Sequence, residues 1–138
     1  MRKPFMTAAL LIASTAGQVA AAQWDISNDK GLVVHRLAAD ALRLTVVCDP
    51  EGAYSPPQEY AIFELSGQRV EGGEVVISRG DTAATLVVVG GSAIPSDNEQ
   101  AWSAAVSMLL TGGPVNIGLG NETVHLDLAP SNSMCQSQ

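Results

Sequence analysis

The stretch LRLTVVCD, residues 42–49, decides the fold of this chain. Side chains along a β-strand point alternately to its two faces. One face would carry Leu42, Leu44, Val46 and Cys48, and the other Arg43, Thr45, Val47 and Asp49. The first face is apolar throughout, which is the pattern of a strand with one buried side. We therefore expect a strand whose cysteine, Cys48, points toward the core.

Similar short stretches recur on both sides of this strand, separated by turns rich in Gly, Asn, Asp and Pro. We expect further strands at 23–27, 32–37, 59–65, 74–78, 85–90, 114–120 and 122–130. One helix is expected at about 97–111, with Ser96 as its cap and Glu99 completing a capping box. Its apolar residues, Trp102, Ala105, Val106, Leu109 and Leu110, fall on one helical face. The pattern predicts an antiparallel β-sandwich or partly open barrel of about eight short strands with one helix.

The N-terminus has the layout of a secretory signal peptide. A basic start is followed by an apolar centre at 8–13 and then by small residues that lead to an Ala-x-Ala site. We expect residues 1–22 to be removed by cleavage between Ala22 and Gln23, leaving a single β-rich domain at 23–138. No later segment has 18 consecutive apolar residues, so we expect no membrane span in the mature chain, which would be periplasmic or secreted.

The charge of the chain restricts its partners. The sequence has 7 Lys and Arg against 14 Asp and Glu. Loss of the two basic residues in the leader would leave a net charge of about −9. Such a domain repels nucleic acid phosphates, so we expect no nucleic acid ligand. We expect a protein partner, and a basic one would be attracted electrostatically. The alternative, that the charge only keeps a small exported domain soluble, stays open.

The chain has two cysteines, and in an exported protein two cysteines predict one disulfide. A Cys48–Cys135 bond would close a long loop and constrain the unfolded chain by about 4 to 5 kcal/mol on the entropy model. A nucleophilic Cys48 is disfavoured because Asp49 and Glu51 follow it and oppose a thiolate. A metal site would require the histidines, Met134 and the cysteines to converge, and no ligand spacing in the sequence predicts one.

No other motif predicts chemistry. The sequence contains no nucleophile elbow, zinc-protease motif or phosphate-binding glycine loop, so we expect neither catalysis nor a cofactor. His35 and His125 stand alone, and we expect each to be hydrogen-bonded locally or solvated. The triplet Arg79-Gly80-Asp81 is expected at a hairpin tip, where it could act as an adhesion sequence. Gly and Asp are also the residues that a tight turn requires, so both interpretations stay open.

Two resemblances suggest a function. An early Trp24, a strand that ends in Cys48, and then a helix, Gly-Gly, two strands and a near-terminal Cys135 resemble small exported bacterial proteins of the invasion-associated locus B kind and the related accessory periplasmic proteins of type VI secretion. That resemblance implies a β-rich, non-catalytic domain that binds or buttresses another component of the cell envelope.

The second resemblance is architectural. Bacterial periplasmic inhibitors of lysozyme are also small, β-rich and tied by a disulfide near the C-terminus. An acidic domain is complementary in charge to a basic enzyme. The alternative function is therefore inhibition of a basic secreted enzyme such as lysozyme.

Overall fold

A computed structural model describes residues 21–131 and Cys135. Ten strands form one sheet in the order β1-β2-β3-β4-β8-β7-β6-β9-β10, with β5 paired to β4. The strands are β1 (Asp25–Asp29), β2 (Leu32–Ala39), β3 (Leu42–Cys48), β4 (Tyr60–Leu65), β5 (Gln68–Arg69), β6 (Gly72–Arg79), β7 (Thr82–Val89), β8 (Ser92–Ala93), β9 (Gly113–Leu119) and β10 (Glu122–Leu128). Every ladder between these strands is antiparallel. The expected fold class is thus confirmed, and over the described residues the sheet does not close into a barrel.

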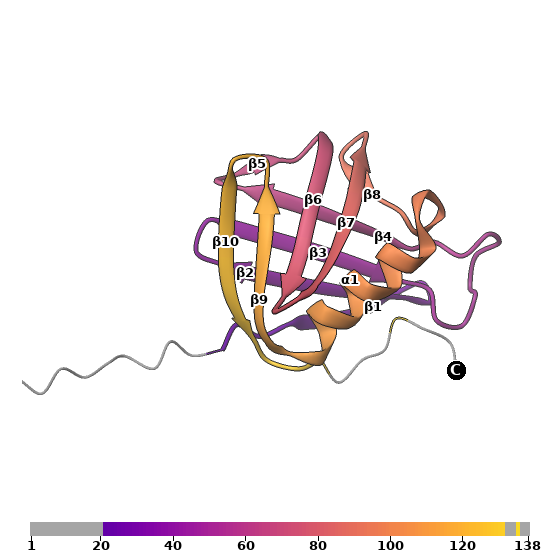
Figure 1. Cartoon of the computed structure of the whole chain (residues 1–138). Helices are drawn as coiled ribbons and strands as arrows, with labels where there is room; N and C mark the ends of the chain where they lie inside the picture. Colours follow the sequence, from indigo (N-terminus) through magenta and orange to yellow (C-terminus); the bar gives the residue numbers. More distant parts are fainter. Residues whose placement is uncertain (1–20, 132–134, 136–138) are drawn as a thin grey trace, which may run out of the picture.

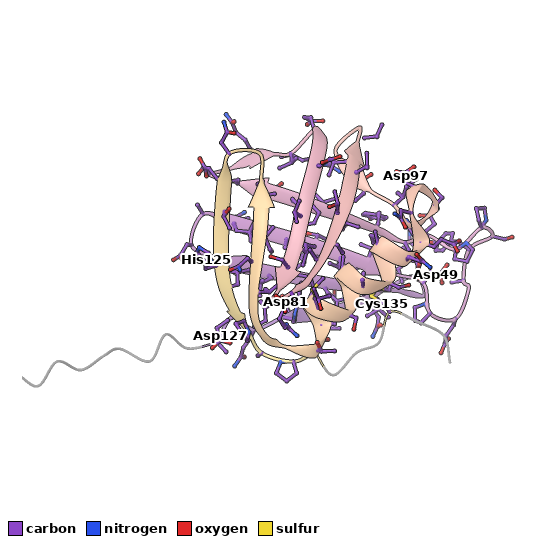
Figure 2. All side chains as sticks on the ribbon, viewed as in Figure 1. Asp49, Asp81, Asp97, His125, Asp127 and Cys135 are labelled. Atoms are coloured by element: carbon purple, nitrogen blue, oxygen red, sulfur yellow. A yellow bond between two sulfur atoms is a disulfide. The ribbon has the colours of Figure 1, made fainter. Side chains whose placement is uncertain are left out.

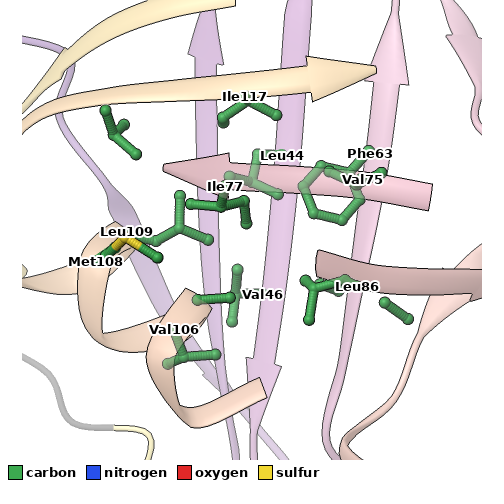
Figure 3. Packing of buried hydrophobic residues seen from close by; sticks show 14 of the residues in the cluster. Leu44, Val46, Phe63, Val75, Ile77, Leu86, Val106, Met108, Leu109 and Ile117 are labelled. Carbon is green, nitrogen blue, oxygen red and sulfur yellow. The ribbon is translucent and has the colours of Figure 1, made fainter. Parts of the chain in front are cut away.

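The sheet folds back on itself to make two layers. Figure 1 shows β2, β3 and β4 running across β6, β7, β9 and β10, so the two layers cross steeply rather than lying parallel. The short β8 joins the layers, since Ala93 pairs with Ala61 of β4 and with Val88 of β7. Side chains from both layers meet between them, as Figure 3 shows for Leu44, Phe63, Ile77, Leu86 and Ile117.

The two ends of the sheet order meet at one point. The amide of Ala22 donates to the carbonyl of Asp127 (2.8 Å), and the amide of Ala129 donates to the carbonyl of Ala22 (2.8 Å). These bonds form a parallel bridge between Ala22 and Leu128. Residues 1–20 of the expected signal peptide, 1–22, lie outside the described part of the chain. Cleavage after Ala22 would remove this bridge.

Helix α1 (Glu99–Thr111) packs against β7 and β6. The buried side chains of α1 are those of Trp102, Ala105, Val106, Met108, Leu109 and Leu110, which confirms the expected apolar face and adds Met108. The predicted start is wrong: Asn98 is the cap, and its side chain accepts from the amide of Ala101 at 3.0 Å. Pro95–Asp97 form a 3₁₀ turn (η1), which moves the start of the helix past Ser96. No helix among the described residues is long and apolar enough to span a bilayer.

Arg79 fixes the other end of the helix. Its guanidinium donates from Nη2 to the carbonyl of Met108 (2.7 Å), from Nε to the carbonyl of Pro114 (2.8 Å) and from Nη1 to the hydroxyl of Thr111 (3.3 Å). A cation is favourable here because the last helical carbonyls have no partner within the helix. Gly80 separates β6 from β7 at the expected hairpin tip. The adhesion hypothesis for this turn remains a prediction, but its arginine is already engaged by the helix.

Candidate functional site

An open groove of about 580 Å³ lies on the solvent side of the layer formed by β2, β3 and β4. Its lining includes outward residues of these strands, such as Arg36, Arg43 and Glu64, together with residues of β1 and β5. The charged and polar side chains of the lining include Asp25, Arg36, Arg43, Thr45, Glu64 and Arg69. We call this the arginine groove, after Arg36, Arg43 and Arg69.

The strand register brings these distant residues together in two rows. In the first row, Arg36 of β2 pairs with Asp25 of β1 on one side and with Thr45 of β3 on the other. In the second row, Glu64 of β4 pairs with Arg43 of β3 and with Arg69 of β5. Directly paired residues on one sheet face have Cβ atoms only about 5 Å apart. The groove is therefore a compact set of charges on rigid strands.

Two of the three arginines are held in place. Arg69 donates from Nε to the carbonyl of Gly91 at 2.9 Å. A Cβ atom at Gly91 would come within 2.8 Å of that Nε, so the contact depends on the glycine. Arg36 donates from Nη1 to the hydroxyl of Ser27 at 3.4 Å. Arg43 is exposed and has no hydrogen bond or ion pair within the described part of the chain, so its guanidinium is available to a ligand.

The groove differs in charge from the rest of the protein. Residues 23–138 contain five basic residues, and three of them line this groove, whereas the same region contains all 14 acidic residues. Only Asp25 and Glu64 of those acids line it. Arginine binds carboxylate and phosphate groups through two parallel hydrogen bonds. The groove can therefore hold an acidic group in a protein that otherwise repels one.

A second outward surface is apolar. Val76 of β6 and Val87 and Val89 of β7 face solvent on the other layer, with Val89 68% exposed. Neighbouring Thr85 pairs with Val76 and lies on the same face. Glu74 pairs with Val87 on this face as well, so the valines are interspersed with polar groups, and nothing in the structure shows what would cover them.

The cysteines form the expected disulfide in the core. Cys48 and Cys135 are bonded, with Cα atoms 4.9 Å apart and exposures of 0% and 4%. Cys48 ends β3 on the core face, together with Val46 and Leu44, as the alternation predicted. The bond therefore ties Cys135, which is labelled in Figure 2, to the end of β3.

His35 lies beside this disulfide, a proximity that the sequence did not indicate. It is completely buried, and its Nδ1 lies 3.1 Å from the carbonyl of Val46. Because a carbonyl only accepts, Nδ1 carries the proton and Nε2 is left with a lone pair. Nε2 has no hydrogen-bond partner among the described residues. The expected local hydrogen bond of His35 is thus present at Nδ1, whereas Nε2 is left unsatisfied, which the sequence did not indicate.

The surroundings of His35 keep it neutral. Burial lowers the pKa of His35, and this outweighs the opposing effect of the Val46 hydrogen bond. The Trp24 and His35 rings pack in a T-shaped arrangement, with ring centroids 6.0 Å apart and an interplanar angle of 86°. Trp24 in turn donates from Nε1 to the carbonyl of Leu109 at 3.1 Å. By contrast, His125 is exposed on β10, where its Nδ1 contacts Oδ1 of Asn116 (Figure 2).

A ring nitrogen of His35 and the two Sγ atoms lie within 4.8 Å of one another. No ligand spacing in the sequence predicted this convergence. It arises because His35 pairs with Val46, so His35 and Cys48 are diagonal neighbours on the core face. We call His35, Cys48 and Cys135 the sulfur–histidine cluster.

Two acidic residues that follow β3, Asp49 and Glu59, lie close together, and Asp49 has a structural role. The carboxylate of Asp49 accepts from the backbone amides of Ala53 (2.6 Å), Tyr54 (3.0 Å) and Gln58 (3.2 Å). Desolvation acts to raise the pKa of Asp49, but these bonds and one from Gly52 outweigh it and lower the pKa. The sequence indicated no pairing of carboxylates. Because backbone amides occupy both oxygens of Asp49, this carboxylate stabilises the loop at 50–58 rather than offering a catalytic base.

Glu59 is the partner in that pair. Its pKa is raised, mainly by desolvation and further by the negative charge of Asp49, while a hydrogen bond from the Asp49 amide partly offsets the shift. Carboxylates with opposite shifts can act as an acid and a base. Here the loop explains both shifts without a substrate.

No protein-family model matches the chain, and neither a curated protein nor a solved structure matches it. The two resemblances drawn from the residue pattern therefore remain expectations.

Proposed function

We propose that this protein is an exported, non-catalytic β-domain that binds another component of the cell envelope through the arginine groove. The group it would bind is a carboxylate or a phosphate. The supporting observation is the gathering of Arg36, Arg43 and Arg69 on paired strands of a strongly acidic chain. The proposal joins this site to the leader-like N-terminus, which supports export.

The build of the groove suits recognition of an acidic group. Strands position side chains more rigidly than loops do, so less conformational freedom is lost on binding. The contacts of Arg36 with Ser27 and of Arg69 with Gly91 hold these two arms before a ligand arrives. Arg43 lies between them in the register and completes the site. Hydrogen bonds to charged groups contribute about 1.5 to 3 kcal/mol each, enough for one arginine to matter.

The proposal can be tested with defined acidic probes, polyglutamate for carboxylates and polyphosphate for phosphates. Affinity is measured for the wild type and for Arg43→Gln. We expect Arg43→Gln to weaken binding of the preferred probe about tenfold, which corresponds to about 1.4 kcal/mol.

The matched control is Lys30→Gln, because Lys30 is an exposed cation outside the groove and its loss changes the net charge equally. We expect less than a twofold effect from it. Equal losses in the two variants would show that only overall charge matters and would refute a groove site. No binding of either probe by the wild type would also refute the acidic-group proposal.

The second candidate is inhibition of a basic secreted enzyme. It is favoured by a different feature, the edge strand β1, which is exposed along its whole length and carries Asp25 and Asp29. Lysozyme activity should then fall on addition of the protein, and the inhibition should weaken steeply as salt is added. Full lysozyme activity at a large molar excess of the protein at low salt would exclude this enzyme as the target.

A further inference from the structure

The sulfur–histidine cluster has the donor atoms of a metal site. His35 comes from β2, Cys48 from the end of β3 and Cys135 from the C-terminal segment, and their donor atoms lie within 4.8 Å of one another. Thiolates that share a metal at about 2.3 Å lie roughly 4 Å apart. Three ligands from separate parts of the chain are therefore already close to the spacing that a metal requires.

The orientation of His35 is the second observation. Histidines that bind metals almost always donate their other ring N–H to a carbonyl or carboxylate, which fixes the ring and exposes one lone pair. Nδ1 of His35 makes this bond to Val46 at 3.1 Å. Its Nε2 is a buried acceptor without a partner among the described residues, and such groups are rare because they cost free energy. Metal binding would satisfy Nε2.

The disulfide closes this site, since two bonded sulfurs are not thiolates. We propose that, when a dithiol reductant opens Cys48–Cys135, the two thiolates and Nε2 of His35 bind one thiophilic d¹⁰ cation, Cu⁺ or Zn²⁺. The disulfide takes up two electrons and two protons from the dithiol, which is itself oxidised to a disulfide. The cation then displaces the two thiol protons.

The donor set selects this class of cation. Thiolates are soft ligands and imidazole suits zinc and copper, so this donor set favours Cu⁺ and Zn²⁺ over Mg²⁺ and Ca²⁺. No fourth histidine, cysteine or carboxylate joins the cluster among the described residues. Three ligands suit Cu⁺, whereas Zn²⁺ would need a water as a fourth ligand. Zn²⁺ has the advantage that its charge balances the two thiolates, so the buried site would be neutral. The two cations are therefore separate arms of one experiment.

The test uses the full mature chain, reduced with a phosphine and desalted without oxygen. Co²⁺ serves as a coloured substitute for Zn²⁺, because thiolate ligation gives it a near-ultraviolet charge-transfer band, and Cu⁺ is titrated against a coloured chelator. We expect one equivalent of at least one cation to bind the reduced protein. The oxidised protein, which has no thiolates, should bind neither at this site.

Two variants show whether the metal binds at the sulfur–histidine cluster or at donor atoms elsewhere in the protein. His35→Leu should weaken binding at least tenfold and remove any histidine contribution to the Co²⁺ spectrum. His125→Gln changes the exposed histidine outside the cluster and should bind as the wild type does. Equal binding by His35→Leu and the wild type would overturn the proposal.

The reduced protein has lost its disulfide, so folding is measured in the same samples. Circular dichroism should show that the cation raises the melting temperature of the reduced wild type more than that of reduced His35→Leu. A reduced wild type that binds neither cation, or that is unfolded and stays unfolded when the metal is added, would also overturn the proposal.

Discussion

Strands β2 and β3 present two chemically different faces, although the residues alternate between them one by one. Inward, they bury the sulfur–histidine cluster and its apolar neighbours, including Leu44 and Val46. Outward, the same strands contribute Arg36 and Arg43 to the arginine groove. A shift of one residue in register would exchange the two sets. Substitution of an inward residue should therefore lower stability, whereas substitution of its outward neighbour should weaken binding.

The largest expected effect belongs to the inward face. The double change Cys48→Ala, Cys135→Ala frees the C-terminal segment and relaxes the constraint on the unfolded chain. We expect the free energy of unfolding to fall by about 4 to 5 kcal/mol. Urea unfolding followed by circular dichroism measures it. A loss below about 1 kcal/mol would show that the core does not depend on the disulfide.

The neighbouring residues Leu44 and Arg43 should differ clearly in their effects on stability and on binding. Leu44 is 1% exposed in the core, whereas Arg43 faces the groove. We expect Leu44→Ala to cost about 3 kcal/mol, because it leaves a cavity between the layers. Arg43→Gln should change stability by no more than about 0.5 kcal/mol while it weakens binding of the acidic probe. Urea midpoints of the two variants provide the comparison, and similar losses would mean that the two faces are not separate in energy.

The alternation made much of the fold predictable. A period of two placed the core face of β3, and a helical period placed that of α1, because both patterns are local. Eight strands match expected stretches, but β5 and β8 were missed. Each has two residues, which is too few to show a period. The start of the helix was missed because Ser96 and Asn98 are both good caps, and the 3₁₀ turn decides between them.

The arginine groove and the sulfur–histidine cluster needed information that a local pattern does not carry. Arg36, Arg43 and Arg69 come together only when the register of four strands is known. His35 is within reach of Cys48 for the same reason. The outward alternation of Arg36 and Arg43 was visible in the sequence, and it was the one signal that could have indicated the groove. The composition shows only the overall negative charge, because it carries no information on where the arginines lie.

The stability of the inward face should depend on pH through His35. The pKa of His35 is lowered from 6.5 by burial, against the opposing Val46 hydrogen bond. Below pH 6.5 the unfolded chain binds a proton that the folded protein does not, so stability is full above that pH and falls as the pH drops. The slope is at most about 1.4 kcal/mol per pH unit, down to the lowered pKa.

Urea unfolding between pH 5 and 7.5 measures this slope. His35→Leu should remove it, because leucine does not titrate. His125→Gln should keep it, because the exposed His125 lies outside the core. An unchanged slope in His35→Leu would show that another group titrates instead.

The smallest effect on stability is expected just after the end of β3, at Asp49 and Glu59. Asp49 follows β3 at an outward position, yet it is only 4% exposed and accepts hydrogen bonds from the loop at 50–58. The pKa of Glu59 beside it is raised from 4.5, mainly by desolvation. The folded protein therefore binds this proton more tightly than the unfolded chain, and stability falls as the pH rises from about 4.5 through the raised pKa.

Asp49 acts in the opposite direction and in a lower window. Its pKa is lowered from 3.8 because its backbone hydrogen bonds outweigh desolvation, so its contribution is present above that pH and lost as the pH falls. Glu59→Gln should flatten the pH dependence above 4.5 without changing the loss below 3.8. Glu51→Gln, an exposed change of equal charge in the same loop, should do neither. If both glutamine variants gave the same pH profile, net charge rather than the environment of Glu59 would govern this part of the curve.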